Sequence, residues 1–149
     1  MYNPFKIFIL LFLTFFISVN CLHAQQSPSS AAKALKVKMK SMFIYQFAKN
    51  VYWPKAYTTG DFTIGIYGSK DLYNLLNTSF KDKMNGSQKI KFAFYESASD
   101  ISDCHLLFVS GEEKEFMATV QKGLNDKTLL VTEGEDLATT GSMINFVYV

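Results

Sequence analysis

Cysteine and histidine are the side chains most often recruited for catalysis, and here they stand side by side in CHLLFVS, residues 104–110. A thiol next to an imidazole could form an activated nucleophile. However, CHLLFVS is a near-continuous apolar run typical of a buried strand, and neighbouring side chains of a strand point to opposite faces. Cys104 and His105 therefore cannot form a dyad. We expect Cys104 to be a buried hydrophobe and His105 to be a hydrogen-bonded structural residue, and we expect no catalytic residue.

The remaining polar patterns do not define a reaction. The chain has no HxxxH, HxH or CxxC spacing for a transition metal, and GIYGS lacks the glycine spacing of a phosphate-binding loop, so we expect no metal and no cofactor. Ligands of open parallel sheets bind at the carboxyl ends of strands. A small-ligand site near Ser69, Ser110 and Glu133 is therefore one alternative, although TEGED (132–136) also fits a solvated turn.

The charge composition argues against nucleic acid as a partner. The chain contains 15 basic residues, all of them lysine, against 13 acidic residues. Arginine supplies most bidentate contacts to phosphate and guanine, and it is absent from the chain. A nearly neutral protein without arginine or a basic stripe is not expected to bind nucleic acid.

The N-terminus predicts export. Lys6 precedes an apolar run that begins at Ile7 and is too short to span a bilayer, and Ala24 offers a small residue for cleavage. We expect residues 1–24 to be a signal peptide and the mature chain to carry no integral membrane segment. A lipoprotein acylated at Cys21 is the weaker alternative, because Asn20 stands where a small residue is expected.

Strand and helix patterns alternate through the mature chain. Residues 25–31 are expected to be a flexible leader, and residues 32–149 a single domain that starts with a helix over 32–52, bounded by Pro54. The order predicts a layered α/β sandwich with a mostly parallel open sheet of about five strands flanked by helices. The expected strands are 62–68, 89–95, 104–110, 127–132 and 142–149, and the further helices are 70–80 and 113–124, the latter with Phe116, Val120 and Leu124 on one face.

The first helix carries an apolar stripe and ends in IYQFAKNVYWP, residues 44–54. We expect Phe43 and Phe47 to belong to the core, with Trp53 either packed beside strand 62–68 or exposed. Trp and Tyr combine a large apolar body with a polar group and are frequent anchors in interfaces. Partner contacts are therefore an open alternative at the aromatic positions Tyr45, Tyr52, Trp53 and Tyr57. The stripe comprises Leu35, Met39, Met42, Phe43, Phe47 and Val51.

Four segments in this order resemble the YfiR-like family of periplasmic proteins. They are KVKMKSMFIYQFAKNVYWP, FTIGIYG, DISDCHLLFVS and LLVTEGEDLATTGSMINFV. The resemblance implies a periplasmic regulator rather than an enzyme. Such a regulator would bind the periplasmic sensor domain of an inner-membrane diguanylate cyclase and repress cyclic-di-GMP output and biofilm formation. The resemblance also suggests a homodimer.

The chain departs from the family pattern at three places. Gly141-Ser142 replaces a more glycine-rich turn, and Leu137 stands where phenylalanine is more typical. Cys104 has no partner cysteine in the mature chain, so disulfide-linked control is not expected. Relatives continue beyond INFV into another strand and a helix, whereas this sequence ends at Val149. We therefore expect an exposed apolar patch near the last strand, covered by another chain if not by a longer reading frame.

Overall fold

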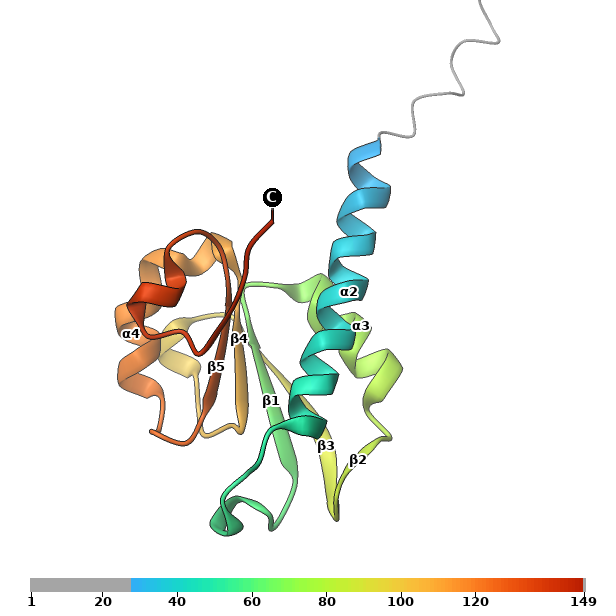
Figure 1. The fold of residues 1–149 in the computed structure, drawn as a ribbon, viewed down its shortest axis with the longest axis vertical. Coiled ribbons are helices and arrows are strands. Elements are labelled where there is room, and N and C mark those ends of the chain that lie inside the picture. Colours follow the sequence, from blue (N-terminus) through green and yellow to red (C-terminus); the bar gives the residue numbers. More distant parts are fainter. Residues whose placement is uncertain (1–27, 149) are drawn as a thin grey trace, which may run out of the picture. The chain divides into compact units, whose positions relative to one another are not determined.

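The central sheet is seen in a computed structural model that describes residues 28–148 (Figure 1). Its six strands run in the order β2-β3-β1-β4-β5-β6, and every neighbouring pair is parallel except β2 with β3. This confirms the predicted α/β class with a mostly parallel sheet. The strands are β1 (Phe62–Tyr67), β2 (Met84–Asn85), β3 (Gln88–Tyr95), β4 (Leu106–Val109), β5 (Leu129–Glu133) and β6 (Ile144–Phe146).

Strand β2 was not predicted from the sequence. It forms a hairpin with β3, in which Asn85 pairs with Gln88 across the turn Gly86–Ser87. Gly86 has a φ of 58°, a conformation that glycine adopts without steric cost and that two-residue hairpin turns require. A two-residue strand gives no readable alternation of polar and apolar positions, which explains why only the turn signal was available.

Helices cover both faces of the sheet. They are α2 (Pro28–Asn50), α3 (Lys70–Phe80) and α4 (Met117–Gly123), the last preceded by a 3₁₀ helix, η3 (Gly111–Phe116). Ile44 and Ala48 of α2 join Leu72 and Leu76 of α3 in the core of one face. Met117 and Val120 of α4 pack in a separate core on the other. Residues Lys36–Val149 form one compact unit, and Pro28–Leu35 belong to another.

The beginning of α2 differs from the prediction. The helix starts at Pro28 rather than at Ala32, so residues 28–31 are helical and not part of a flexible leader. Proline is tolerated in the first turn of a helix, where its missing N–H would have no intrahelical partner. Ala31 and Ala32 then continue the helix because alanine has the highest helix propensity. The predicted signal peptide and residues 25–27 lie outside the described residues.

The predicted phase of the helix after β4 is also corrected. Phe116 is 47% exposed, whereas Met117 is buried with Val120. The buried face consists of Met117, Val120 and Leu124, spaced i, i+3 and i+7. Phe116 lies outside this repeat, at the end of the 3₁₀ helix.

The face that α2 presents to the sheet is the most consequential difference. The buried positions are Lys40, Ser41, Ile44 and Ala48, and not the predicted apolar stripe. Ile44 and Ala48 join the core of this face, and the small Ser41 is buried next to Lys40. The stripe residues Leu35, Met39, Met42 and Phe43 are exposed, so the prediction that Phe43 is a core residue is wrong. Phe47 and Val51 are half-buried and pack against the core, which agrees with the prediction for Phe47.

Candidate functional site

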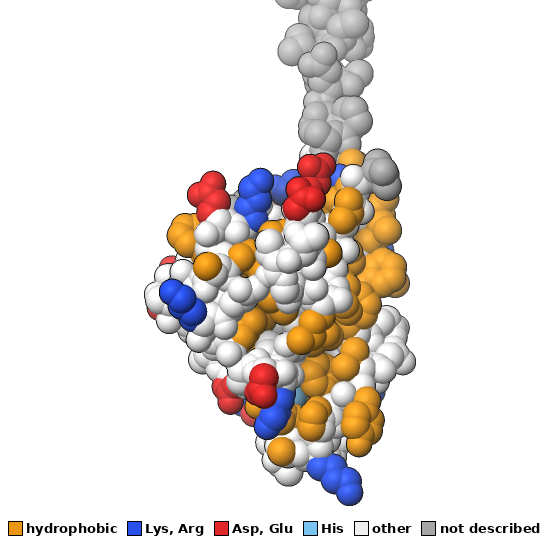
Figure 2. All heavy atoms as spheres, turned by 60° about the vertical axis from the view of Figure 1, so that its left-hand side comes forward, with side chains coloured by type: hydrophobic (Ala, Val, Ile, Leu, Met, Phe, Trp, Pro, Cys, Tyr) orange, Lys and Arg blue, Asp and Glu red, His pale blue; other side chains and the backbone are white. Residues whose placement is uncertain are grey.

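The outward stripe of α2 continues onto the edge strand of the sheet and forms one apolar surface. Met39, Met42 and Phe43 are 48%, 57% and 47% exposed, although helices of globular proteins usually turn such residues to the core. We name this the α2–β6 surface and define it by Met39, Met42, Phe43, Phe47, Ile144 and Phe146. Figure 2 shows hydrophobic side chains gathered along one side of the molecule.

Aromatic contacts join the two elements of the α2–β6 surface. The ring centroids of Phe43 and Phe47 lie 6.2 Å apart, and each lies close to Phe146 of β6, at 6.1 and 6.2 Å. Phe146 in turn contacts Phe108 of β4 at 6.5 Å, beneath the surface. Phe146 therefore connects the rings of α2 to the buried core.

The predicted aromatic residues that follow α2 belong to a different cluster, at the amino ends of β1 and β4. Trp53 donates its indole N–H to the carbonyl oxygen of Ala48 at 3.1 Å and meets the ring of Phe62 edge to face at 5.0 Å. Trp53 thus packs beside β1, the first of the two arrangements considered from the sequence. A Trp whose polar group is satisfied internally is a structural anchor for the chain that leaves α2.

His105 is the centre of this cluster. Its ring stacks on Phe62 at 4.4 Å, and its Nδ1 accepts a hydrogen bond of 3.2 Å from the backbone N–H of Thr63. Its Nε2 lies 2.9 Å from the carbonyl oxygen of Tyr57 and must donate there, because Nδ1 is the acceptor. His105 therefore fixes the loop between α2 and β1 to the sheet, as a structural histidine with both ring nitrogens hydrogen-bonded. Cys104 packs in the core of the opposite face, so the expected separation of thiol and imidazole is confirmed.

Replacing His105 by Phe should keep the ring stack and remove both hydrogen bonds. We expect the free energy of unfolding to fall by about 2 kcal/mol, because Thr63 N–H and Tyr57 C=O would lose their partner in a partly buried place. Urea unfolding followed by the fluorescence of Trp53, the only tryptophan, measures this change. Lys127→Ala, which removes an exposed amine 5.0 Å from the Tyr57 ring, is the control and should change little. Unchanged stability of His105→Phe would show that the loop between α2 and β1 keeps its position without the imidazole.

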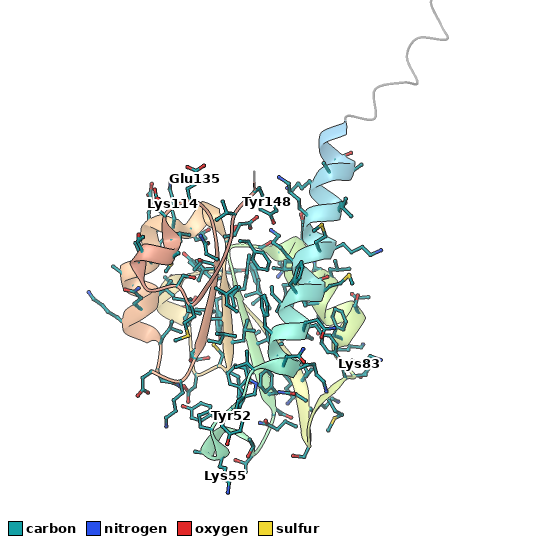
Figure 3. The ribbon with its side chains drawn as sticks, in the orientation of Figure 1. Tyr52, Lys55, Lys83, Lys114, Glu135 and Tyr148 are labelled. Carbon is teal, nitrogen blue, oxygen red and sulfur yellow. The ribbon has the colours of Figure 1, made fainter. Side chains whose placement is uncertain are left out.

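The four residues predicted to contact a partner do not form one site. Tyr45 stacks on Phe80 of α3 at 4.4 Å, and Tyr57 and Trp53 both pack against His105. Tyr52 is 86% exposed and lies just after α2. Figure 3 shows Tyr52 near Lys55 at one end of the sheet and Tyr148 at the opposite end. A direct role in partner binding stays a prediction for all four.

The residues predicted to hold a small ligand lie at the carboxyl edge of the sheet. Ser110 and Glu133 follow the paired residues Val109 and Thr132, so they are neighbours, and Ser69 follows the end of β1. Ser110 is buried, and its N–H donates to the Tyr67 carbonyl oxygen at 3.0 Å. The ligand-binding role of the three residues stays a prediction.

Glu133 is held by groups of this chain. Lys40 Nζ lies 2.7 Å from Glu133 Oε2, and the two side chains are only 8% and 19% exposed. The phenol of Tyr148 also interacts with the Glu133 carboxylate. Burial, and then this carboxylate, raise the pKa of Tyr148 to about 12. At the end of β1, burial together with a hydrogen bond to Glu113 raises the pKa of Tyr67 to about 12. These carboxylates therefore have internal partners that a ligand would have to displace.

The thiol of Cys104 should make the protein sensitive to alkali. Burial raises its pKa from 9.0 to about 12, so the unfolded chain releases this proton before the folded chain does. The free energy of unfolding should therefore fall as the pH rises above about 9, with a slope of up to about 1.4 kcal/mol per pH unit. Urea unfolding between pH 9 and 10, below the ordinary tyrosine range, measures the slope. In Cys104→Ala the slope should flatten, and an equal slope in both proteins would refute this assignment.

Sequence reasoning identified the stripe of α2 but assigned it to the wrong side. A signal for the true orientation was present in a second set of positions at helical spacing, Val37, Ser41, Ile44 and Ala48, which meets the predicted stripe at Val51. Phe146 was predicted only as part of a strand, and its contacts with α2 could not be read from the sequence. Among residues 28–148, no cluster of His, Cys, Asp and Glu is placed to hold a metal, and none of the described helices is long and apolar enough to span a bilayer.

Comparison with known proteins identifies the family. The family model described as YfiR/HmsC-like matches residues 37–149, which include most of α2, all strands and the whole α2–β6 surface. No curated protein matches the chain. The match covers most of the sequence and agrees with the resemblance carried by the Trp-Pro, glycine-turn and CHLLFVS segments. This chain therefore belongs to the YfiR/HmsC-like family.

Proposed function

We propose that this protein is an exported periplasmic signalling modulator without enzymatic activity. It binds the periplasmic sensor region of an inner-membrane enzyme and represses a diguanylate cyclase, which lowers cyclic-di-GMP output and biofilm formation. The observation that carries the proposal is the α2–β6 surface, which exposes two methionines and a phenylalanine beside the ring of Phe146. Exposed apolar surfaces of this kind mark protein–protein contacts. The chain belongs to the YfiR/HmsC-like family, and its resemblance to that family implies a regulator, which supports the same proposal.

The mode of action follows from linkage between binding and conformation. A modulator that prefers one conformation of a sensor domain shifts the population of that domain by its difference in affinity for the two forms. Methionine suits such a surface because its side chain is unbranched and adapts to different partners. We propose that Tyr52 extends the contact beyond α2, and that Trp53 and Tyr57 position the loop that carries it.

A pull-down from solubilised membranes tests the proposal. The tagged protein should recover a membrane enzyme with a periplasmic sensor domain, identified by mass spectrometry. Met42→Gln should reduce the recovery and raise cyclic-di-GMP in cells that contain the enzyme, whereas Phe116→Gln, on the other face of the sheet, should do neither. Trp53→Ala should act only to the extent that it unfolds the loop. Failure of the folded wild-type protein to recover any such enzyme would overturn the proposal.

A further inference from the structure

The three most outward apolar residues of α2, Met39, Met42 and Phe43, have lysines on both sides. At about 100° per residue, Lys38 and Lys49 project on one side of them and Lys36 on the other, between Phe43 and Phe47. All three are exposed, and the helix contains no acidic residue. The other lysine in this part of the helix, Lys40, is buried and paired with Glu133. The exposed apolar part of α2 within the α2–β6 surface therefore has positive charge on both of its sides.

Two of the bordering lysines are held in position by other elements. Lys36 Nζ lies 4.2 Å from the centre of the Tyr148 ring, and Lys49 Nζ donates a hydrogen bond of 3.1 Å to the Met84 carbonyl oxygen. Neither contact neutralises the charge. Both restrict the flexible lysine side chains and so reduce the entropy that a partner would otherwise have to remove.

We infer that the α2–β6 surface binds an amphipathic helix whose apolar face is bordered by aspartates or glutamates. The inference rests on the proposed function, since it gives the chemistry of the partner at that same surface. A helix places apolar side chains at i, i+3, i+4 and i+7 along a neighbouring helix, and these would contact Met39, Met42 and Phe43. Its acidic borders would then face Lys36 on one side and Lys38 and Lys49 on the other.

The structure favours a helix over two other occupants. An added strand would need the outer edge of β6, but β6 has only three residues and offers few backbone groups for a ladder. Anionic membranes are typically bound by clusters of roughly four to eight basic residues. Three lysines spread around a stripe fall short of such a cluster.

Two labelled peptides of about 18 residues, long enough to form helices, test the inference by fluorescence anisotropy. Both carry the same row of leucines on one face, and they differ only in having glutamates or lysines at its borders. The glutamate peptide should bind the wild-type protein at least about tenfold more tightly, and high salt should reduce the difference. Phe43→Ser should weaken binding about 30-fold, as expected for a central aromatic anchor.

Charge reversal provides the decisive comparison. Lys38→Glu should remove or reverse the preference for the glutamate peptide, and Lys36→Glu should do the same from the other border. Lys114→Glu, an exposed position in η3, is the matched control and should leave the preference unchanged. Equal binding of the two peptides, or binding of phosphatidylglycerol vesicles but of neither peptide, would overturn the inference. If the peptides fail while the membrane pull-down succeeds, the acidic-helix inference is wrong and the proposed function stands.

Discussion

Glu133→Gln is expected to lower the free energy of unfolding by about 3 kcal/mol. Removing one member of a buried ion pair leaves the other charge without compensation, which costs more than the pair itself contributes. Here the ammonium of Lys40 is buried, 2.7 Å from Glu133 and 5.5 Å from the ring centre of Phe108. Urea or thermal unfolding measures the loss.

A double-mutant cycle separates the cost of an unpaired buried charge from the cost of changing either side chain alone. Lys40→Met alone should cost less, because Glu133 keeps Tyr148 as a partner and some access to water. The double variant Lys40→Met, Glu133→Gln should recover most of the stability lost in Glu133→Gln, since no buried charge remains. Equal stabilities of Glu133→Gln and the wild-type protein would show that the pair is not formed, and Glu133 would then be free for the ligand role predicted from sequence.

Unlike Glu133→Gln, which is expected to lower stability, Phe43→Ser is expected to weaken partner binding strongly and to change the stability of the fold only slightly. The Phe43 ring is 47% exposed and rests on Phe47 and Phe146 at the surface, so its loss should cost no more than about 1.5 kcal/mol. A central aromatic anchor of an interface contributes at least about 2 kcal/mol, or roughly 30-fold in affinity. Recovery of the membrane partner and unfolding of the purified variant measure the two effects.

Phe116→Ser is a matched control, because Phe116 has the same exposed fraction and lies beside Tyr67 on another element. It should change neither partner recovery nor the preference for an acidic peptide. If Phe43→Ser instead unfolds the protein, Phe43 is a core residue as the sequence suggested. If it leaves both stability and recovery unchanged, the partner binds elsewhere.

The class of the fold could be predicted from the sequence because its strongest signals are local. The apolar strands β4 and β5 and the helix α3 show the periodicities of buried strands and of an amphipathic helix. The chemistry of Cys104 and His105 was predictable for the same reason, since it depends only on the alternation of side chains along a strand. These elements required no knowledge of distant contacts.

The orientation of α2 could not be read in the same way. Its apolar residues occupy more than one side of the helix, so periodicity alone allows more than one buried face. Tertiary contacts select one of these faces, because Ile44 and Ala48 join the core and Lys40 pairs with Glu133 at the end of β5. Both contacts depend on residues distant in the sequence. The ligand residues were placed at the correct sheet edge, but Lys40 and Tyr148 as partners of Glu133 were not foreseen.

Photocrosslinking from α2 in the cell tests the central claim most directly. A photoreactive amino acid at position 42, within the α2–β6 surface, should form an adduct with the periplasmic region of a membrane-bound signalling enzyme, and mass spectrometry of the adduct would identify the contacting segment. The same group at position 116 should form no such adduct. An adduct from position 116 and none from position 42, with the partner present, would contradict the account and move the binding site to the opposite face of the sheet.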